Sequence, residues 1–318
     1  MKKLVWLLVA VLCMTIMIGS SATAEYPERS ITVVVPFGAG GEHDMVARVI
    51  AQQMQKWGYT FVVQNTTNSS GTTIDYLNDK KKHDGYTLLM HSPEVMASQY
   101  LSGSVPYEVH DKIVYLGNFV FDPLILCVAK DSPYNSLQDI IDAAKEKPDE
   151  IKWASVSASG KNAWDAQYLY GLFDAQFLYV PYENASLSRA AVMGGHAEVY
   201  HAYVSGAKIS IDAGELKPIA VGAPERVPFL PDVPTLKELG YDAEVGLTRC
   251  WDISPEVDQA IIDRLVKDLK ECLESEETQT ALYELGATPV WRTPEEMLAY
   301  GQEQFDIYKG MLDAGIIQ

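Results

Sequence analysis

Short apolar runs rich in β-branched residues alternate with amphipathic segments along most of the chain. The first run, Ile31–Val35, ends at Pro36 and leads through a glycine-rich stretch into a segment of helical periodicity from about Asp44 to Lys56. Such alternation is typical of α/β folds, in which helices cover a mostly parallel sheet. Further short strands are expected at Phe61–Val63, Thr87–Met90, Leu124–Ala129, Ile151–Ala154, Phe177–Val180, Ala197–Tyr200 and Pro218–Val221.

Capping patterns mark where several helices should begin. Ser136-Leu137-Gln138-Asp139 is a capping box that predicts a helix to about Lys147, and Thr293-Pro294-Glu295-Glu296 repeats the signal near the C-terminus. Ser254-Pro255 offers an N-cap followed by a proline at the first helical position, so a helix is expected from there. Its apolar face would carry Val257, Ile261, Leu265 and Leu269.

The first residues have the pattern of an export signal. A basic start at Lys2 precedes the apolar stretch Leu4–Ile18, and Ala22-Thr23-Ala24 is a small-residue cleavage site. The stretch is short for a membrane span, which needs roughly 20 residues. Lipid attachment at Cys13 is the weaker alternative because a leucine precedes it. We therefore predict that residues 1–24 are removed after Ala24 and that a soluble protein reaches the periplasm.

The composition limits the classes of partner. With 25 Lys and Arg against 43 Asp and Glu, the formal net charge is −18, which repels nucleic acid and anionic lipid. Any anion site must therefore rely on local donors. Cys127, Cys250 and Cys272 show no metal-ligand spacing, so no metal is expected, and either one disulfide or free thiols remain open. The chain exceeds the typical size of one core, which predicts two lobes with a cleft between them.

The glycine loop between Ile31–Val35 and the following helix is the main candidate site. Backbone N–H groups at such a turn, together with the positive end of the helix dipole, can hold a phosphate or a carboxylate. Glu42 and His43 stand where a Walker loop needs lysine and serine or threonine, and no third glycine completes a dinucleotide fingerprint. A carboxylate site and a plain tight turn remain as alternatives.

Six motifs in order resemble the substrate-binding proteins of tripartite tricarboxylate transporters, also called the Bug family. The resemblance covers essentially the whole chain after the export signal. The motifs are Tyr26–Ile31 with Val35-Pro36-Phe37, Gly40-Gly41, Asp44 and Ala47-Arg48; Asp84–Leu89; Val180-Pro181-Tyr182 with Gly194-Gly195; Leu230–Thr235 with Glu238 and Gly240; Thr293–Glu296; and Ala314-Gly315-Ile316.

The resemblance implies a two-lobed periplasmic binding protein, with residues 25–122 and 225–318 in one lobe and residues 123–224 in the other. Such a receptor closes on a small organic carboxylate and delivers it to the permease subunits of a membrane transporter. No catalysis or cofactor is implied, and a monomer is expected. A periplasmic sensor that serves a receptor kinase remains an alternative. An exported serine hydrolase is a weaker one, because Val156–Gly160 lacks the Gly-x-Ser-x-Gly elbow.

By position in the resemblance, ligand-binding residues are expected in both lobes. Asp44 would accept a hydrogen bond from the ligand or satisfy helix N–H groups. His201, where the family commonly has an aromatic residue, would donate to the ligand or simply pack, and its titration would make binding pH-dependent. The identity of the carboxylate remains open. The expected site comprises Phe37, Gly38, Ala39, Gly40, Gly41, Asp44, His91, Ser92, Ser155, Ser157, Ser159, Gly160, Tyr182, Asn184, His201 and Tyr203.

Overall fold

The computed structural model describes residues 26–66, 83–105 and 112–318. The expected export signal, its cleavage site and the Cys13 alternative lie outside these residues. Within them, no helix is long and apolar enough to cross a membrane.

The described strands form one mixed sheet of ten strands that is continuous through two lobes. In the first lobe β1 (Ile31–Val35) lies between β2 (Phe61–Asn65) and β3 (Thr87–His91), all parallel. In the second lobe β5 (Lys152–Val156) lies between β6 (Leu178–Tyr182) and β7 (Val199–Tyr203), again all parallel. Each lobe therefore has the parallel core that the alternating pattern predicts.

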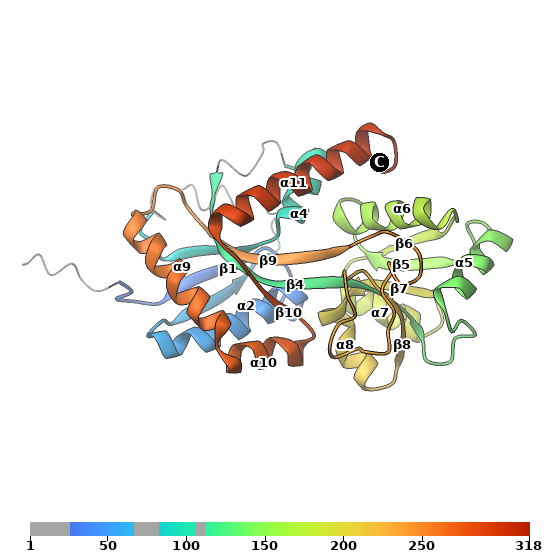
Figure 1. Ribbon diagram of the computed structural model, residues 1–318, viewed down its shortest axis with the longest axis horizontal. Helices are drawn as coiled ribbons and strands as arrows, with labels where there is room; N and C mark the ends of the chain where they lie inside the picture. The colour runs from blue at the N-terminus through green and yellow to red at the C-terminus, as the bar shows by residue number, and fades with distance from the viewer. Residues whose placement is uncertain (1–25, 67–82, 106–111) are drawn as a thin grey trace, which may run out of the picture.

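Two long strands connect the lobes. β4 (Val114–Ala129) pairs through its first half with β9 (Gly246–Ile253) and with β10 (Thr288–Arg292), and through its second half with β7 and with β8 (Leu216–Val221), all antiparallel. In Figure 1, β4 and β9 run along the long axis of the molecule from one lobe into the other. The two-lobed α/β fold expected from the sequence is thus confirmed, and crossing strands rather than a linker join the lobes.

Each lobe has its own hydrophobic core. Val33, Leu88 and Trp251 are among the buried residues of the first, and Leu126 and Trp153 are among those of the second. Residues 236–247 also contribute to the second core, through Leu236, Ala243, Val245 and Leu247. The lobe boundary at 225 stays a prediction, and this packing favours a later crossing, within β9.

The helices cover both faces of the sheet (Figure 1). The capping boxes of Ser136 and Thr293 are confirmed, since each side chain accepts from the N3 amide of its helix. The helices are α2 (Glu42–Gln53), α4 (Pro93–Leu101), α5 (Leu137–Glu146), α6 (Lys161–Phe173), α7 (Ala185–Met193), α8 (Val204–Asp212), α9 (Gln259–Glu274), α10 (Glu276–Leu285) and α11 (Pro294–Asp313), and a 3-10 turn, η1 (Met54–Trp57), follows α2.

The helix start expected at Ser254-Pro255 is wrong. α9 begins at Gln259, where the carboxylate of Asp258 accepts a hydrogen bond from the amide of Ala260 at 2.9 Å. The hydroxyl of Ser254 instead accepts from the amide of Glu256 at 3.3 Å, which closes a local turn ahead of the helix. Ser254 and Pro255 thus belong to a turn that precedes α9, and the N-cap of the helix is Asp258.

Candidate functional site

A cleft of about 540 Å³ lies between the lobes, beside the crossing strands. The first lobe contributes the glycine loop and the first turn of α2. The second lobe contributes the start of α7, the end of β7 and the first turns of α8. Of the expected site residues, the structure brings eight from the two lobes to this cleft: Phe37, Gly38, Ala39, Gly40, Gly41, Asn184, His201 and Tyr203.

The glycine loop is held by bonds within the loop. Gly40 has φ +76°, a left-handed conformation that favours glycine, and the amide of Gly41 donates to the carbonyl of Gly38 at 3.2 Å. The amide of Gly40 donates to Asp44 Oδ2 at 2.9 Å. Two of the N–H groups that could have served a ligand are therefore committed inside the loop.

Asp44 has partners that fix the loop rather than a position in the cleft lining. Its carboxylate accepts from the amide of Gly40 and forms an ion pair with Arg48 on the next helical turn. Burial alone would raise the pKa of this carboxyl, but the hydrogen bonds from Arg48 and Gly40 outweigh it and lower the pKa. These contacts favour a structural role for Asp44 over a role in ligand binding. Its backbone partner is the amide of Gly40 in the loop.

His201 presents a donor with a fixed orientation. Its side chain is 1% exposed, and its Nδ1 accepts a hydrogen bond from the indole Nε1 of Trp153 at 3.0 Å. An indole N–H can only donate, so the neutral ring carries its proton on Nε2. That Nε2 is buried and has no hydrogen-bond partner in the described part of the chain. Because His201 lines the cleft, this unpartnered N–H is a candidate donor to a ligand there.

The expectation that His201 titrates near neutral pH is wrong. Burial, aided by the charge of Lys161, lowers the pKa of His201 to about 3. The ring therefore stays neutral between pH 5 and 8, and it cannot make binding depend on pH in that range.

The other residues at the second-lobe wall are fixed by local bonds. Asn184 is the N-cap of α7, and its Oδ1 accepts from the amide of Leu187 at 3.0 Å. The hydroxyl of Tyr203 donates to Asn162 Oδ1 at 2.9 Å, which places both side chains in the cleft wall. Both side chains therefore have protein partners in the absence of a ligand.

Besides Asp44, seven of the expected residues lie outside the lining of this cleft. His91 is fully buried, with its Nδ1 at 2.9 Å from Asp252 Oδ2, because β3 pairs with β9 there. The hydroxyl of Ser92 donates to the carbonyl of Thr248 and also contacts the ring of His43, which does line the cleft. The remaining five are Ser155, whose hydroxyl donates to the carbonyl of His201, and Ser157, Ser159, Gly160 and Tyr182. Their contact with ligand stays a prediction.

Sequence reasoning missed several cleft residues that carry titratable groups, among them Glu42, His43, Glu183 and Arg189. Glu42 and His43 follow the glycine loop directly, so the first turn of α2 should have been included with it. His43 stacks on Phe37, with ring centroids 4.1 Å apart, and burial lowers its pKa well below the usual value. Arg189 is the one Lys or Arg between Lys161 and Lys208. This isolation in the sequence was the signal that could have identified it as a cleft residue.

A buried ion pair joins the crossing strands beneath the cleft. Arg249 of β9 donates to Asp122 of β4 at 2.7 Å, and both side chains are fully buried. Asp122 also accepts from the amide and the hydroxyl of Ser205 at the start of α8. One carboxylate thus links both crossing strands to a helix that lines the cleft.

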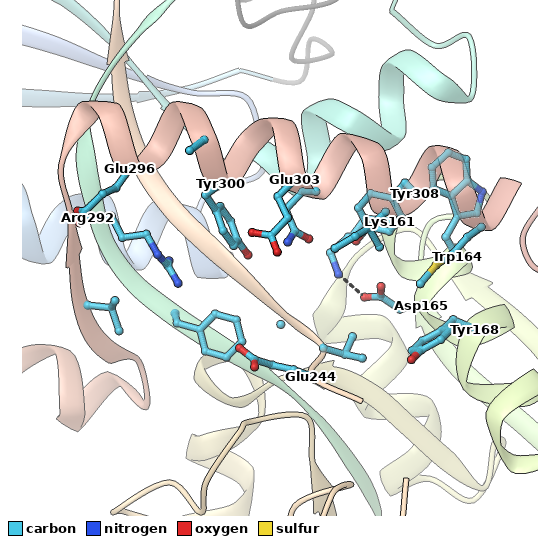
Figure 2. Close-up of a pocket in the computed structure, with 18 of the residues that line it drawn as sticks. Lys161, Trp164, Asp165, Tyr168, Glu244, Arg292, Glu296, Tyr300, Glu303 and Tyr308 are labelled. Carbon is cyan, nitrogen blue, oxygen red and sulfur yellow. Dashed lines mark hydrogen bonds and ion pairs between the residues drawn. The ribbon is translucent and has the colours of Figure 1, made fainter. Parts of the chain in front are cut away.

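A second space between the lobes, of about 720 Å³, lies under α11 (Figure 2). Lys161 and Asp165 form an ion pair there at 2.6 Å, and the guanidinium of Arg292 lies 4.5 Å from the ring centroid of Tyr300, although Arg292 Nη1 has no hydrogen-bond partner among the described residues. The hydroxyl of Tyr300 donates to Glu94 at 2.7 Å. None of the expected site residues lines this space, whereas eight of them line the smaller cleft, so we take the smaller cleft as the candidate site. Among the described residues, no group of three or more His, Cys, Asp or Glu is placed to hold a metal ion.

The three cysteines of the described chain are buried free thiols. The disulfide alternative left open by their spacing is not formed.

Known proteins resemble this chain over most of its length. Residues 46–314 match the family described as tripartite tricarboxylate transporter family receptor. Protein BugT of Bordetella pertussis is 30% identical over 292 residues, which cover 90% of this chain and 89% of BugT. The structure of the periplasmic binding protein BugD, 28% identical, has a TM-score of 0.80 and matches 92% of this chain and 99% of its own.

A further solved structure shares the fold. It is that of R. palustris Rpa4515 with adipate, which is 23% identical, has a TM-score of 0.83, and matches 92% of this chain and 99% of its own. The family match over residues 46–314 and the likeness to BugT confirm the family indicated by the six motifs. The chain therefore belongs to the tripartite tricarboxylate transporter receptor family, a family of substrate-binding receptors.

Proposed function

We propose that this protein captures a small organic carboxylate in the cleft of about 540 Å³ and carries it to a membrane transporter. The observation that carries the proposal is the neutral His201 ring, whose buried Nε2 donor has no partner in the described chain. A carboxylate is acceptor-only when ionised and fits such a donor. In the first lobe, the glycine loop and the N-terminus of α2 add backbone donors with a favourable dipole.

The acidic surface does not argue against an anionic ligand. The formal net charge of −18 acts at long range through solvent and salt, whereas the cleft donors act at hydrogen-bond distance in a partly dry space. Water molecules can bridge the ligand to loop groups that do not reach it directly. R. palustris Rpa4515, which has the same fold, was solved with adipate, and this supports an organic acid as the ligand.

We infer that the receptor works outside the cytoplasm. The basic and apolar pattern of residues 1–24 supports export to the periplasm. The partners would be the permease subunits of a tripartite tricarboxylate-type transporter, which the family description supports. Closure of the two lobes about β4 and β9 would distinguish loaded from empty receptor, and the permease would bind the loaded form.

A thermal-shift screen tests the ligand class. Mono-, di- and tricarboxylates, neutral sugars and simple cations are added separately to the exported form of the protein. A carboxylate at 100 times its Kd should stabilise the folded state by about 2.7 kcal/mol. A shift produced by a sugar or a cation but by no carboxylate contradicts the proposal.

A further inference from the structure

Glu42 brings a carboxylate into the same cleft. It is the first residue of α2, directly after the glycine loop, and it lines the cleft together with His201. Its side chain reaches across to the second lobe, where a methyl group added at Gly206 of α8 would collide with Glu42 Oε1. The carboxylate of Glu42 can occupy this position only because residue 206 is a glycine without a side chain.

This carboxylate has no matching partner in the protein. In the described ranges its side chain forms no hydrogen bond to another residue and no ion pair. Two guanidiniums act on it from a distance: Arg249 donates through Nη1 to Asp122, while its Nε and Nη2 have no partner among the described residues, and Arg189 donates to the carbonyl of Gly206 at 2.9 Å. Burial raises the pKa of Glu42, chiefly because the charged form loses its water. Glu42 is partly buried and has no hydrogen-bond donor of its own, and a ligand that supplies one would stabilise its charged form.

The charges of the cleft lining favour a ligand with two kinds of polar group. The lining carries the carboxylates of Glu42 and Glu183 and one guanidinium, that of Arg189, while burial lowers the pKa of both His43 and His201. A plain anion would meet His201 as a donor and Glu42 as a repelling charge. A molecule with a carboxylate at one point and a hydrogen-bond donor at another satisfies both side chains.

We propose that the ligand is a carboxylate that also carries an ammonium or hydroxyl group, and that Glu42 accepts from that group while His201 Nε2 donates to the carboxylate. The proposal rests on the proposed function, since it assumes that a carboxylate occupies this cleft. It assigns to Glu42 the discrimination between substituted and plain organic acids.

The test compares acids that share a carbon skeleton and differ at one carbon. Succinate, malate and aspartate form one such series, and propionate, lactate and alanine form another. Isothermal titration of the wild-type protein should give a Kd about 10-fold lower for the amino or hydroxy member than for the plain acid, as one charge-assisted hydrogen bond implies. Glu42→Gln keeps the size of the side chain and should reduce this ratio to about 3-fold or less, without weakening the plain acid.

Two further variants separate a specific effect from a general one. Glu225→Gln removes an exposed carboxylate outside the cleft lining and should leave the ratio unchanged. Gly206→Ala displaces the carboxylate of Glu42 while favouring α8, because alanine is the better helix former. It should therefore lower the ratio as Glu42→Gln does, without lowering the melting temperature, so that the result does not depend on one variant folding.

The outcomes distinguish the two proposals. If a plain acid binds as tightly as its amino and hydroxy counterparts, or if Glu42→Gln and Gly206→Ala leave the ratio unchanged, the role of Glu42 is overturned and carboxylate binding stands. If none of these acids binds and another class of solute does, both proposals are overturned.

Discussion

The two spaces between the lobes are lined by different helices, one by α2, α7 and α8 and the other by α6 and α11. In Figure 1, α11 lies on one side of β4 and β9, and α2, α7 and α8 lie on the other. The larger, of about 720 Å³, contains the paired Lys161 and Asp165, but Arg292 Nη1 there has no hydrogen-bond partner among the described residues. The smaller, of about 540 Å³, has the unpartnered Nε2 of His201 and the carboxylate of Glu42, which forms no ion pair within the described residues. Unpartnered polar groups thus occur at both spaces, and the glycine loop with the N-terminus of α2 behind it distinguishes the smaller one as the binding site.

The two spaces also share a wall, which makes a paired comparison possible. The hydroxyl of Tyr203, a residue of the smaller cleft, lies 3.5 Å from Asp165, which lines the larger space. Figure 2 shows Lys161 and Asp165 facing each other at the α6 side of the space under α11. Changes on either side of this wall should separate effects on ligand binding from effects on stability.

The largest expected effect is the loss of folding stability when one partner of a buried ion pair near each space is replaced. Asp122→Asn leaves the guanidinium of Arg249 buried and without its carboxylate, and should lower the free energy of unfolding by about 3–5 kcal/mol. Asp165→Asn should cost less, because Lys161 lines a space that water can enter. Urea unfolding followed by circular dichroism measures both. Equal losses would mean that the pair joining the crossing strands is no more critical than the pair at the pocket wall.

The second effect concerns ligand affinity. His201→Phe removes the Nε2 donor and should raise the Kd for a bound carboxylate about 10-fold or more, since a charged group loses a hydrogen bond. Glu303→Gln changes a charge that lines the space under α11 and should leave the Kd unchanged (Figure 2). Titration calorimetry measures both. A larger loss of affinity in Glu303→Gln than in His201→Phe would mean that the ligand binds in the space under α11 and not in the smaller cleft.

Much of the fold could be predicted from the sequence, because strand, turn and cap signals act locally. The capping boxes of Ser136 and Thr293 are examples, since each needs contacts over only three residues. The first half of β4 was missed because Gly117, Asn118 and Asp122 interrupt its apolar pattern. Its pairing with β9 lies more than 100 positions away in the chain, and no local rule reports such a partner.

The part of the candidate site that comes from one continuous segment could be predicted from the sequence. The glycine loop was identified because its residues are consecutive. The donor role of His201 depends on Trp153, 48 positions earlier, whose indole fixes the tautomer across paired strands. Serines of the loop after β5 were expected in the cleft by their type, but Ser157 donates to the carbonyl of Ser159 within its own loop. Type and order in the sequence cannot reveal which polar groups remain unmatched after folding.

A third effect concerns stability and pH. In the unfolded chain a histidine binds its proton near pH 6.5, whereas in the folded protein burial lowers the pKa of His201 to about 3. The unfolded state therefore binds more protons between these values, so the free energy of unfolding should fall as pH is lowered through this window. The pKa of His43 is also lowered, which adds to the same trend. The lining of the space under α11 contains no histidine among its described residues.

Unfolding free energies measured at pH 7, 6 and 5 test this assignment to the smaller cleft. His201→Phe should show a shallower decline than the wild-type protein, because one buried neutral base has been removed. His196→Phe alters an exposed histidine and serves as the matched control, with an unchanged slope. An identical slope in His201→Phe and wild type would contradict the buried neutral state of that ring.

The smallest expected effect is the loss of stability when the N-cap of α11, the helix over the larger space, is removed. Thr293→Ala removes the hydroxyl that caps α11 and should cost about 1 kcal/mol of stability, since an N-cap amide loses its acceptor. Ser136→Ala makes the same change at the capping box of α5, whose residues line neither space, and should cost a similar amount. Because α11 lines the larger space and contributes no residue to the lining of the smaller cleft, carboxylate affinity should be the same in both variants. A weaker affinity in Thr293→Ala alone would mean that the position of α11 is coupled to the cleft through Lys161, Asp165 and Tyr203, and the two spaces would then act as one system.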